Sequence, residues 1–190
     1  MRSFFFALLL LLSACKGSDQ TVQEIGLYNI DGDRVGAATF TEQSKGVNIK
    51  VKVEGLKPGF HGIHIHEFPK CEAPYFQSAG NHFNPDGKEH GLMHPKGAHV
   101  GDLPNVEANS SGHIDTELML PEATLLDGKN SILQNEGTSL IITEKPDDGM
   151  SQPSGDSGAR IVCGILTEQS VEKSGEEPSD PTENNEEEDQ

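Results

Sequence analysis

Isoleucine and histidine alternate within residues 60–66, and this alternation constrains the fold more than any other feature of the chain. Successive side chains of a β-strand point to opposite faces, so Ile63 and Ile65 share one face while His64 and His66 share the other. The isoleucine face predicts a hydrophobic core on one side of the strand. The two histidines look away from that core, at a spacing that lets both imidazoles bind one metal ion.

Other segments also have the pattern of strands. Residues 45–54 alternate aliphatic and polar side chains, as a half-buried strand does. Residues 139–144 form another predicted strand, with Thr143 on the face opposite Leu140 and Ile142. Turn signals containing Gly and Pro separate such runs, and no stretch shows a convincing 3.6-residue apolar period. The chain is therefore expected to be all-β, an antiparallel sandwich or barrel.

Residues 67–104 form a long segment rich in Pro, Gly, Asn and His, with little strand or helix pattern. A loop of that length in a compact domain is normally functional, and something other than a backbone ladder must hold it. One available device is metal binding by four residues with metal-ligand side chains: His82, His90, His99 and Asp102.

The N-terminus reads as a secretory signal. Met1 and Arg2 precede an apolar run over residues 4–12, which is too short to span a bilayer as a helix. The sequence Leu12-Ser13-Ala14-Cys15 resembles a bacterial lipobox, in which the Cys becomes the lipid-bearing first residue; the alternative is an ordinary signal peptide with a coincidental Cys. We expect a signal over 1–14, a lipidated Cys15 with a linker over 15–20, and export to a membrane surface, either the outer face of a plasma membrane or the periplasmic side of an outer membrane.

Two further cysteines, Cys71 and Cys163, remain once Cys15 is assigned to lipid. An exported domain lies in an oxidising compartment, so we expect these two to pair. Closing so long a loop could contribute ~4–5 kcal/mol in the chain-entropy account of disulfide stabilisation.

The C-terminus is strongly acidic. Residues 171–190 contain nine acidic residues and one basic residue, a charge of −8 out of −17 for the chain, and Val171 is their only aliphatic residue. We expect residues 169–190 to form a disordered tail, which leaves residues 21–168 as one domain large enough for a hydrophobic core. So acidic a balance argues against nucleic acid as a partner.

Four segments, residues 59–67, 78–85, 99–105 and 158–164, resemble those of the copper–zinc superoxide dismutases in order and spacing. The resemblance covers essentially all of residues 21–168. It implies a Greek-key antiparallel β-barrel or sandwich with long metal-binding loops, and the dismutation of superoxide to O2 and H2O2.

The resemblance also implies two neighbouring metal ions, with His82 as a bridging imidazolate between them. The implied copper ligands are His64, His66 and His82. The implied zinc ligands are His82, His90, His99 and Asp102, a closed four-coordinate set that suits a structural role.

Further matched positions surround these ligands. Asp147 matches an aspartate that hydrogen-bonds one histidine of each metal site, which fixes ring orientation. Arg160 matches the arginine that attracts and orients superoxide, and the two paired cysteines match the family's disulfide. Three histidines match no ligand position: His61, with the parity of the isoleucines, is expected to be buried, and His94 and His113 are expected to be exposed loop residues.

The departure from the family lies at Thr143, where the resemblance implies a fourth copper ligand, a histidine. A neutral hydroxyl is a poor ligand for either copper oxidation state. In the cycle that the family implies, His82 releases copper and takes a proton, so the reduced ion would keep only His64 and His66.

Two functions follow. The first, towards which the motif set leans, is an exported, lipid-anchored superoxide dismutase with zinc, weakly held copper, and weak or lost activity. The alternative is a non-enzymatic lipoprotein that binds zinc and copper for storage or delivery. A third reading has Met93 or His94 swing in as a substitute copper ligand. The sequence predicts neither a monomer nor a dimer.

Overall fold

This computed structural model describes residues 22–168, which contain nine strands and one 3₁₀ helix joined by loops. The strands are β1 (Val22–Asn29), β2 (Arg34–Gln43), β3 (Gly46–Val53), β4 (Gly59–His61), β5 (Ile63–His66), β6 (Val106–Ala108), β7 (Ile114–Pro121), β8 (Thr138–Thr143) and β9 (Arg160–Leu166). The 3₁₀ helix is η1 (Gln77–Ala79). The expected signal, the lipid site at Cys15 and the acidic tail lie outside the described residues. Within residues 22–168, no helix has the length and apolar character needed to cross a membrane.

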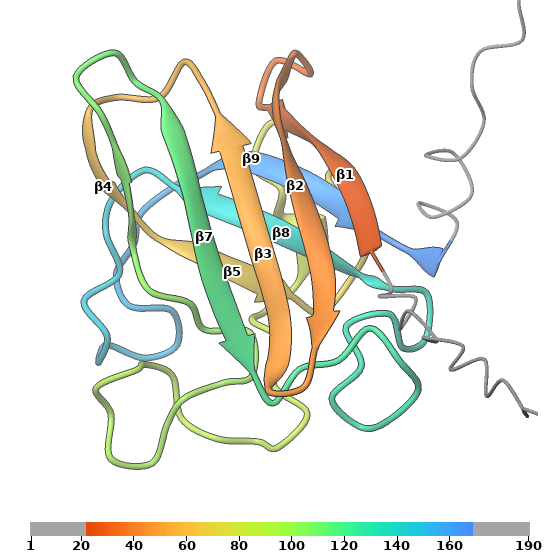
Figure 1. Cartoon of the computed structure of the whole chain (residues 1–190). Coiled ribbons are helices and arrows are strands. Elements are labelled where there is room, and N and C mark those ends of the chain that lie inside the picture. The colour runs from red at the N-terminus through yellow and green to blue at the C-terminus, as the bar shows by residue number, and fades with distance from the viewer. Residues whose placement is uncertain (1–21, 169–190) are drawn as a thin grey trace, which may run out of the picture.

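Seven strands form one curled antiparallel sheet, in the order β5-β8-β9-β1-β2-β3-β7 (Figure 1). Hairpins join β1, β2 and β3, and β9 returns from the far end of the chain to pair with β1. The short strands β4 and β6 pair separately. The expected all-β antiparallel fold is confirmed.

Strand β3 shows how the sequence pattern produces this sheet. Its alternation places Val47, Ile49 and Val51 inside the curl, each with 0% exposure. The intervening lysines point outwards, where Lys52 lies 3.5 Å from a carboxylate oxygen of Asp115 on the neighbouring strand β7. A strand with one buried and one solvated face needs this period of two.

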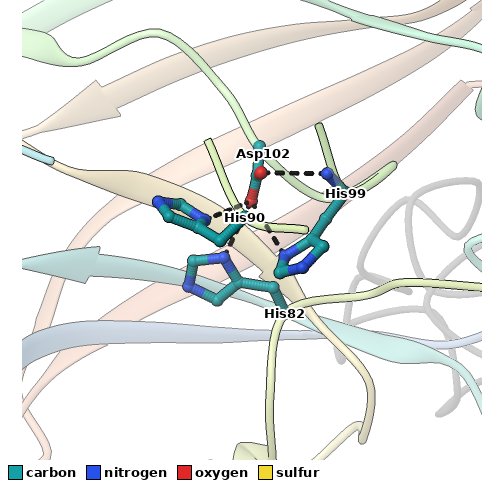
Figure 2. A group of neighbouring side chains, drawn as sticks. All are labelled: His82, His90, His99 and Asp102. Carbon is teal, nitrogen blue, oxygen red and sulfur yellow. Dashed lines mark hydrogen bonds and ion pairs between the residues drawn. The ribbon is translucent and has the colours of Figure 1, made fainter. Parts of the chain in front are cut away.

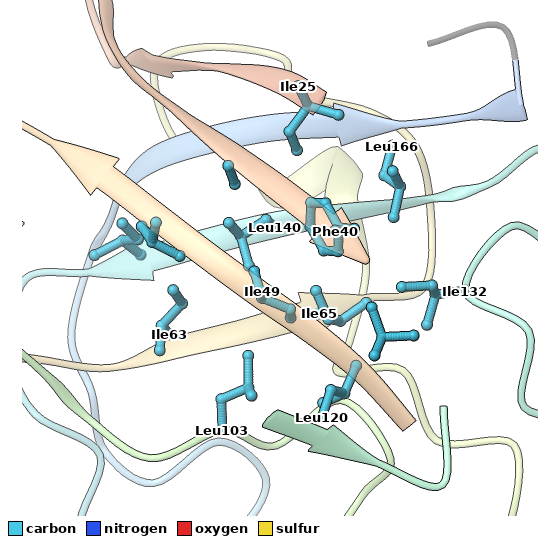
Figure 3. Close-up of a cluster of buried hydrophobic side chains, with 14 of the residues drawn as sticks. Ile25, Phe40, Ile49, Ile63, Ile65, Leu103, Leu120, Ile132, Leu140 and Leu166 are labelled. Atoms are coloured by element: carbon cyan, nitrogen blue, oxygen red, sulfur yellow. The ribbon is translucent and has the colours of Figure 1, made fainter. Parts of the chain in front are cut away.

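The hydrophobic core fills the inside of the curl (Figure 3). Phe40 from β2, Ile65 from β5 and Leu140 from β8 meet there, each fully buried. Burying such a side chain contributes roughly 1.5–3 kcal/mol. Because β5 and β8 commit alternate residues to this core, their remaining side chains must point to the outer face, where the candidate site lies.

The stretch 60–66 is not one continuous strand. It is interrupted at Gly62, so that β4 and β5 belong to different sheets. Gly62 itself lies close to β8: a Cβ on it would lie 2.5 Å from Thr143 Oγ1, and its carbonyl accepts a 2.9 Å hydrogen bond from Thr143 N. Glycine, which has no side chain, allows this close approach.

Candidate metal centre

His64 and His66 lie on the outer face of β5, as their parity predicts, yet they are only 0% and 2% exposed because the long loop covers them. One nitrogen of each ring is held: His64 Nε2 donates to Asp147 Oδ2 at 2.6 Å, and His66 Nδ1 donates to Gly80 O at 3.0 Å. The other nitrogens, His64 Nδ1 and His66 Nε2, are buried without a hydrogen-bond partner. Buried polar atoms are rarely left unpaired, so these two are the donors expected of a metal site.

The long loop reaches this site by lying along the free edge of β5. Ile65 N donates to Gly101 O at 2.9 Å, and Phe83 N donates to Ile65 O at 2.8 Å. These bonds bring His82 and Asp102 beside the β5 histidines. Gly101 is required for the approach, because a Cβ there would lie 2.4 Å from Ile65 O. A ligand candidate here stands next to a residue that anchors the loop in the core: His82 is followed by the buried Phe83.

Asp102 gathers three imidazoles around one point (Figure 2). Its Oδ1 lies 2.8 Å from Nδ1 of His82, 3.1 Å from Nδ1 of His90 and 3.4 Å from Nδ1 of His99. In a tetrahedral zinc site with ligands at ~2.0–2.1 Å, ligand atoms lie about 3.3 Å apart, which is close to this spacing. Gly91 N and His99 N donate to the other carboxylate oxygen at 2.9 and 3.0 Å, so Asp102 is fixed from behind.

The protonation states of these groups suit metal binding. Burial lowers the pKa of His82 to about 4, and burial likewise holds the pKa of His66 well below its usual value. Both rings are therefore neutral at pH 7, the form that binds metals. Burial opposes ionisation of Asp102, but hydrogen bonds from the surrounding histidines hold its pKa well below the usual range.

His90 differs from the other rings. Burial alone would lower the pKa of His90, but hydrogen bonds to the carboxylates of Asp102 and Asp147 outweigh it and raise the pKa to about 9. Without a metal ion this ring holds a proton at neutral pH. A cation bound beside Asp102 would have to displace that proton.

Among the described residues, two groups could each hold a metal ion, and His82 belongs to both. The groups are His82, His90, His99 and Asp102, and His64, His66 and His82, with ligand atoms in each lying within 4.8 Å of one another. Asp147 connects the two groups: its carboxylate accepts from His64 Nε2 at 2.6 Å and from His90 Nε2 at 3.1 Å.

Asn105 positions Asp147, a role that the sequence did not reveal. Its amide donates to Asp147 O and accepts from Asp147 N, both at 2.8 Å. Asn105 lies within one of the family-like segments, but nothing in that segment indicates which distant peptide the amide will meet. The pairing depends on the path of the loop after β8.

Thr143 is 4% exposed and lies next to Gly62, whose carbonyl accepts a hydrogen bond from Thr143 N at 2.9 Å. A Cβ on Gly62 would lie 2.5 Å from the Thr143 hydroxyl oxygen and 3.2 Å from His64 Cε1, a ring carbon bonded to the free Nδ1. The Thr143 hydroxyl donates to Lys145 O at 3.1 Å. His61 Nδ1 donates to Thr143 O at 2.8 Å, which confirms the expected burial of His61 with hydrogen-bond partners.

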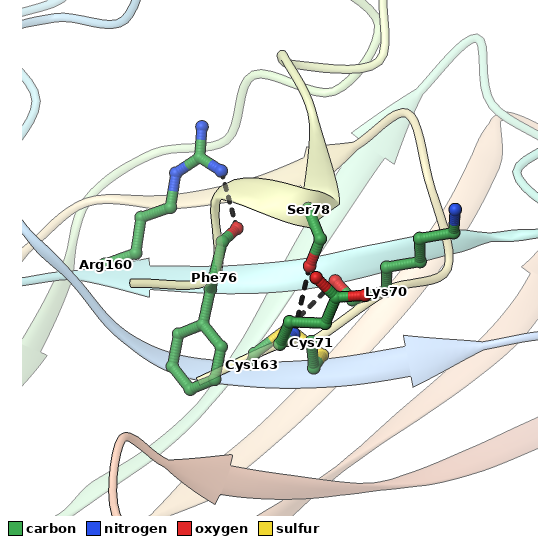
Figure 4. The surroundings of a disulfide bond; sticks show 7 residues. Lys70, Cys71, Phe76, Ser78, Arg160 and Cys163 are labelled. Carbon is green, nitrogen blue, oxygen red and sulfur yellow. Dashed lines mark hydrogen bonds between the residues drawn. A yellow bond between two sulfur atoms is a disulfide. The ribbon is translucent and has the colours of Figure 1, made fainter. Parts of the chain in front are cut away.

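Arg160 is tied to the loop that the disulfide anchors. Its guanidinium donates to Phe76 O and Gly80 O, both at 2.7 Å. The expected bond between Cys71 and Cys163 is present and joins the start of this loop to β9 (Figure 4). Arg160 also borders a cavity of about 400 Å³. The other residues that line it are Glu67, Asn81, His82, Asn84, His99, Pro153 and Ser154.

Three other candidates lie outside both groups. Met93 is 69% exposed and packs against Gly149. His94 Nδ1 accepts from Lys96 N at 3.2 Å, and the His113 side chain, 54% exposed, lies 3.9 Å from Glu54. Neither His94 nor His113 belongs to either group of described side chains that could hold a metal ion.

Comparison with known proteins agrees with this geometry. Residues 34–166 match the family model of copper/zinc superoxide dismutase (SODC). A Superoxide dismutase [Cu-Zn] 2 of Aquifex aeolicus is 42% identical over 160 residues, 83% of this chain and 93% of that protein. The extracellular superoxide dismutase [Cu-Zn] of Drosophila melanogaster is 40% identical, over 75% of this chain and 81% of that one.

Solved structures agree as well. The crystal structure of a SOD-like protein from Bacillus subtilis matches with a TM-score of 0.74 at 41% identity, covering 76% of this chain and 97% of that one. The Cu/Zn superoxide dismutase from Brucella abortus matches with a TM-score of 0.65 at 29% identity, covering 77% and 99%. The fold is therefore the expected antiparallel barrel of this type. The chain belongs to the copper/zinc superoxide dismutase family.

Proposed function

We propose that this protein is an exported, lipid-anchored, zinc-binding member of the family whose superoxide dismutase activity is weak or lost. The observation that carries the proposal is the contrast between its two groups of ligands. His82, His90 and His99 each place a ring nitrogen 2.8–3.4 Å from Asp102 Oδ1, close to the separation of ligand atoms around a tetrahedral zinc ion. The neighbouring group supplies only three imidazoles, and Thr143 occupies the position of the fourth.

The proposed zinc ligands are His82, His90, His99 and Asp102, and the proposed copper ligands are His64, His66 and His82. Bound copper would supply one-electron redox chemistry towards superoxide, and bound zinc would hold the long loop.

The chain's own residues would do the rest. Arg160, at the wall of the cavity, would attract and orient the superoxide anion. Asp147 keeps hydrogens on Nε2 of His64 and of His90, so that Nδ1 of each ring is the nitrogen that would face a metal once His90 has lost the proton it shares with Asp102. His82 Nε2 is the atom that would take up and release a proton.

Thr143 weakens this arrangement in a specific way. Its hydroxyl hydrogen is already committed to Lys145 O, and a neutral oxygen is a poor partner for Cu(I). While His82 Nε2 carries a proton, only His64 and His66 would remain as copper ligands. The same observation favours a second candidate, a non-enzymatic lipoprotein that stores or delivers zinc and copper.

One comparison tests the proposal and separates the two candidates. The chain from residue 16 onwards is purified as wild type, Thr143→His and Thr143→Val, and zinc content, copper affinity and superoxide dismutation are measured. We expect one tightly bound zinc in all three and low activity in wild type and Thr143→Val. Thr143→His should raise copper affinity by more than the ~10–100-fold typical of an outer-sphere partner, and activity with it. Family-level activity in the wild type would refute our interpretation of Thr143, and copper bound tightly without turnover would favour storage or delivery.

The anchoring part of the proposal has its own test. Its support is the lipobox-like sequence ending at Cys15, the disulfide, and the extracellular relative. The proposed boundaries are a signal over 1–14, a lipidated Cys15 with a linker over 15–20, the folded domain over 21–168 and an acidic tail over 169–190. A Cys15→Ser variant should lose incorporation of labelled fatty acid and move from the membrane fraction to the soluble fraction; an unchanged distribution would contradict lipid anchoring.

A further inference from the structure

A side-chain amide pairs with the backbone of one candidate zinc ligand. Gln152, in the loop between β8 and β9, accepts a 2.9 Å hydrogen bond from His90 N at its Oε1 and donates one of 2.9 Å from Nε2 to His90 O. Its Nε2 also donates to Met150 O at 3.0 Å. The amide therefore uses its acceptor and both donors, and its orientation is fixed.

His90 is consequently held at two separate places. The carboxylates of Asp102 and Asp147 hold its ring, and Gln152 holds its peptide. The family resemblance accounts for the contacts of the ring. It does not account for the contact of the peptide, and glutamine at this position carries no motif that would indicate it.

The segment after His90 packs tightly against the loop that carries Gln152. Gly91 has a φ of +109°, and a Cβ there would lie 2.1 Å from Gly149 O. Gly91 N donates to Asp102, and Met93 N donates to Gly149 O at 3.2 Å. Residues 90–93 thus lie directly against residues 149–152, so a displacement of Gln152 would reach the ligand carboxylate through one peptide.

The other side of the same loop forms part of the cavity wall. Pro153 and Ser154, which follow Gln152, line the cavity of about 400 Å³ together with His99 and Arg160. Residues 152–154 therefore make two kinds of contact. The side chain of Gln152 binds the peptide of His90, and Pro153 and Ser154 line the cavity beside Arg160.

We propose that Gln152 is a positioning residue, which fixes the His90 peptide against the loop that forms the wall of the Arg160 cavity. The zinc readout of this inference rests on the proposed function, because it requires that the four-residue group binds zinc. Partners outside the ligand shell commonly affect metal affinity by ~10–100-fold. Gln152 acts through two neutral, partly exposed hydrogen bonds, so we expect a value near the lower end, about 10-fold.

The test uses the chain from residue 16 onwards as wild type, Gln152→Ala, Gln152→Glu and a control, Gln43→Ala, at the end of β2. Gln152→Glu keeps an acceptor for His90 N but loses the donor that faces two carbonyl groups. Zinc affinity is measured by competition with a chromogenic chelator, and backbone hydrogen exchange is followed with and without saturating zinc.

In the wild type and the control, we expect zinc to slow exchange both in residues 82–102 and in residues 153–159. In both Gln152 variants, zinc affinity should fall about 10-fold, and saturating zinc should still protect 82–102 but no longer 153–159. Exchange in β1–β3 in the same samples reports that the barrel is folded.

Zinc affinity within twofold of wild type, or undiminished protection of 153–159, would overturn the role of Gln152. Failure of the wild type itself to bind zinc would instead overturn the proposed function, and it would be seen before any variant is compared.

Discussion

Asp147→Asn is the substitution that most directly tests whether the two groups of ligands form one unit. Asp147 is the residue whose carboxylate contacts a ring from each group, at 2.6 Å for His64 and 3.1 Å for His90. Asparagine has nearly the same shape, which matters because Gly155 packs so closely that even a Cβ there would lie 2.0 Å from Asp147 Oδ1. The substitution therefore changes hydrogen bonding and charge with almost no change in side-chain volume.

The size of the effect follows from the bonds that are lost. An amide has one acceptor oxygen and loses the charge, so it cannot serve both rings as the carboxylate does. A hydrogen bond to a charged group contributes roughly 1.5–3 kcal/mol, equivalent to about 10–150-fold in an equilibrium constant. This range agrees with the ~10–100-fold effects measured for outer partners of metal ligands. We therefore expect zinc and copper affinity each to fall by at least about 10-fold.

The assay is competition of zinc and of copper with chelators of known affinity, measured separately for each metal. The matched control is Asp148→Asn, because within residues 22–168 the hydrogen bonds of the exposed Asp148 carboxylate stay inside its own loop, at Met150 N and Ser151. The control should leave both affinities within about twofold of wild type. If Asp147→Asn weakened zinc alone and left copper unchanged, the reasoning that one carboxylate orients both groups would be wrong.

Three further predictions concern protonation, the disulfide and the interruption at Gly62. Because the pKa of His90 is raised to about 9, zinc binding at pH 7 should release about one proton, and this release should diminish as pH rises through 9; calorimetry in buffers of different ionisation enthalpy measures it, and no release at pH 7 would contradict the assignment. Replacing Cys71 and Cys163 by alanine should lower the free energy of unfolding by ~4–5 kcal/mol, since the bond closes a separation of 92 residues; a loss below ~1 kcal/mol in urea unfolding would contradict it. Gly62→Ala should lower the free energy of unfolding by ~1–3 kcal/mol, because the new Cβ would lie 2.5 Å from Thr143 Oγ1. Adding Thr143→Ala to the same chain should recover most of that loss. Equal losses with and without the Thr143 hydroxyl would show that the hydroxyl is not the obstacle.

The barrel strands could be predicted from the sequence because their pattern is local. Valine and isoleucine alternate with lysine along β3, and this period of two alone determines which residues enter the core. The same argument placed His64 and His66 together on one face. It could not predict that both would be buried, since their cover comes from a loop that pairs with β5 through single bridges at His82 and Asp102.

Contacts between distant loops were beyond sequence reasoning for a different physical reason. Asn105 meets the peptide of Asp147 42 residues away, and Gln152 meets the peptide of His90 62 residues away. An amide can pair with any peptide that it reaches, so residue type carries no information about the partner. Histidines and carboxylates clustered at ligand spacing do carry such information, because burying several of them together is favourable only where a metal ion or matched polar partners compensate.

Thr143 combines a feature that the local strand pattern predicts with one that it does not. Its identity and the face of its strand are visible in the sequence, but the aim of its side chain is not, because a register shift falls between Ile142 and Thr143 where β8 pairs with β9. Such a bulge redirects a side chain relative to simple alternation. Gly62 then leaves room for the Thr143 hydroxyl, because a Cβ there would lie 2.5 Å from Oγ1. A histidine placed at 143 would leave the strand from the same backbone position, so the copper affinity of Thr143→His measures what a ligand at that position contributes.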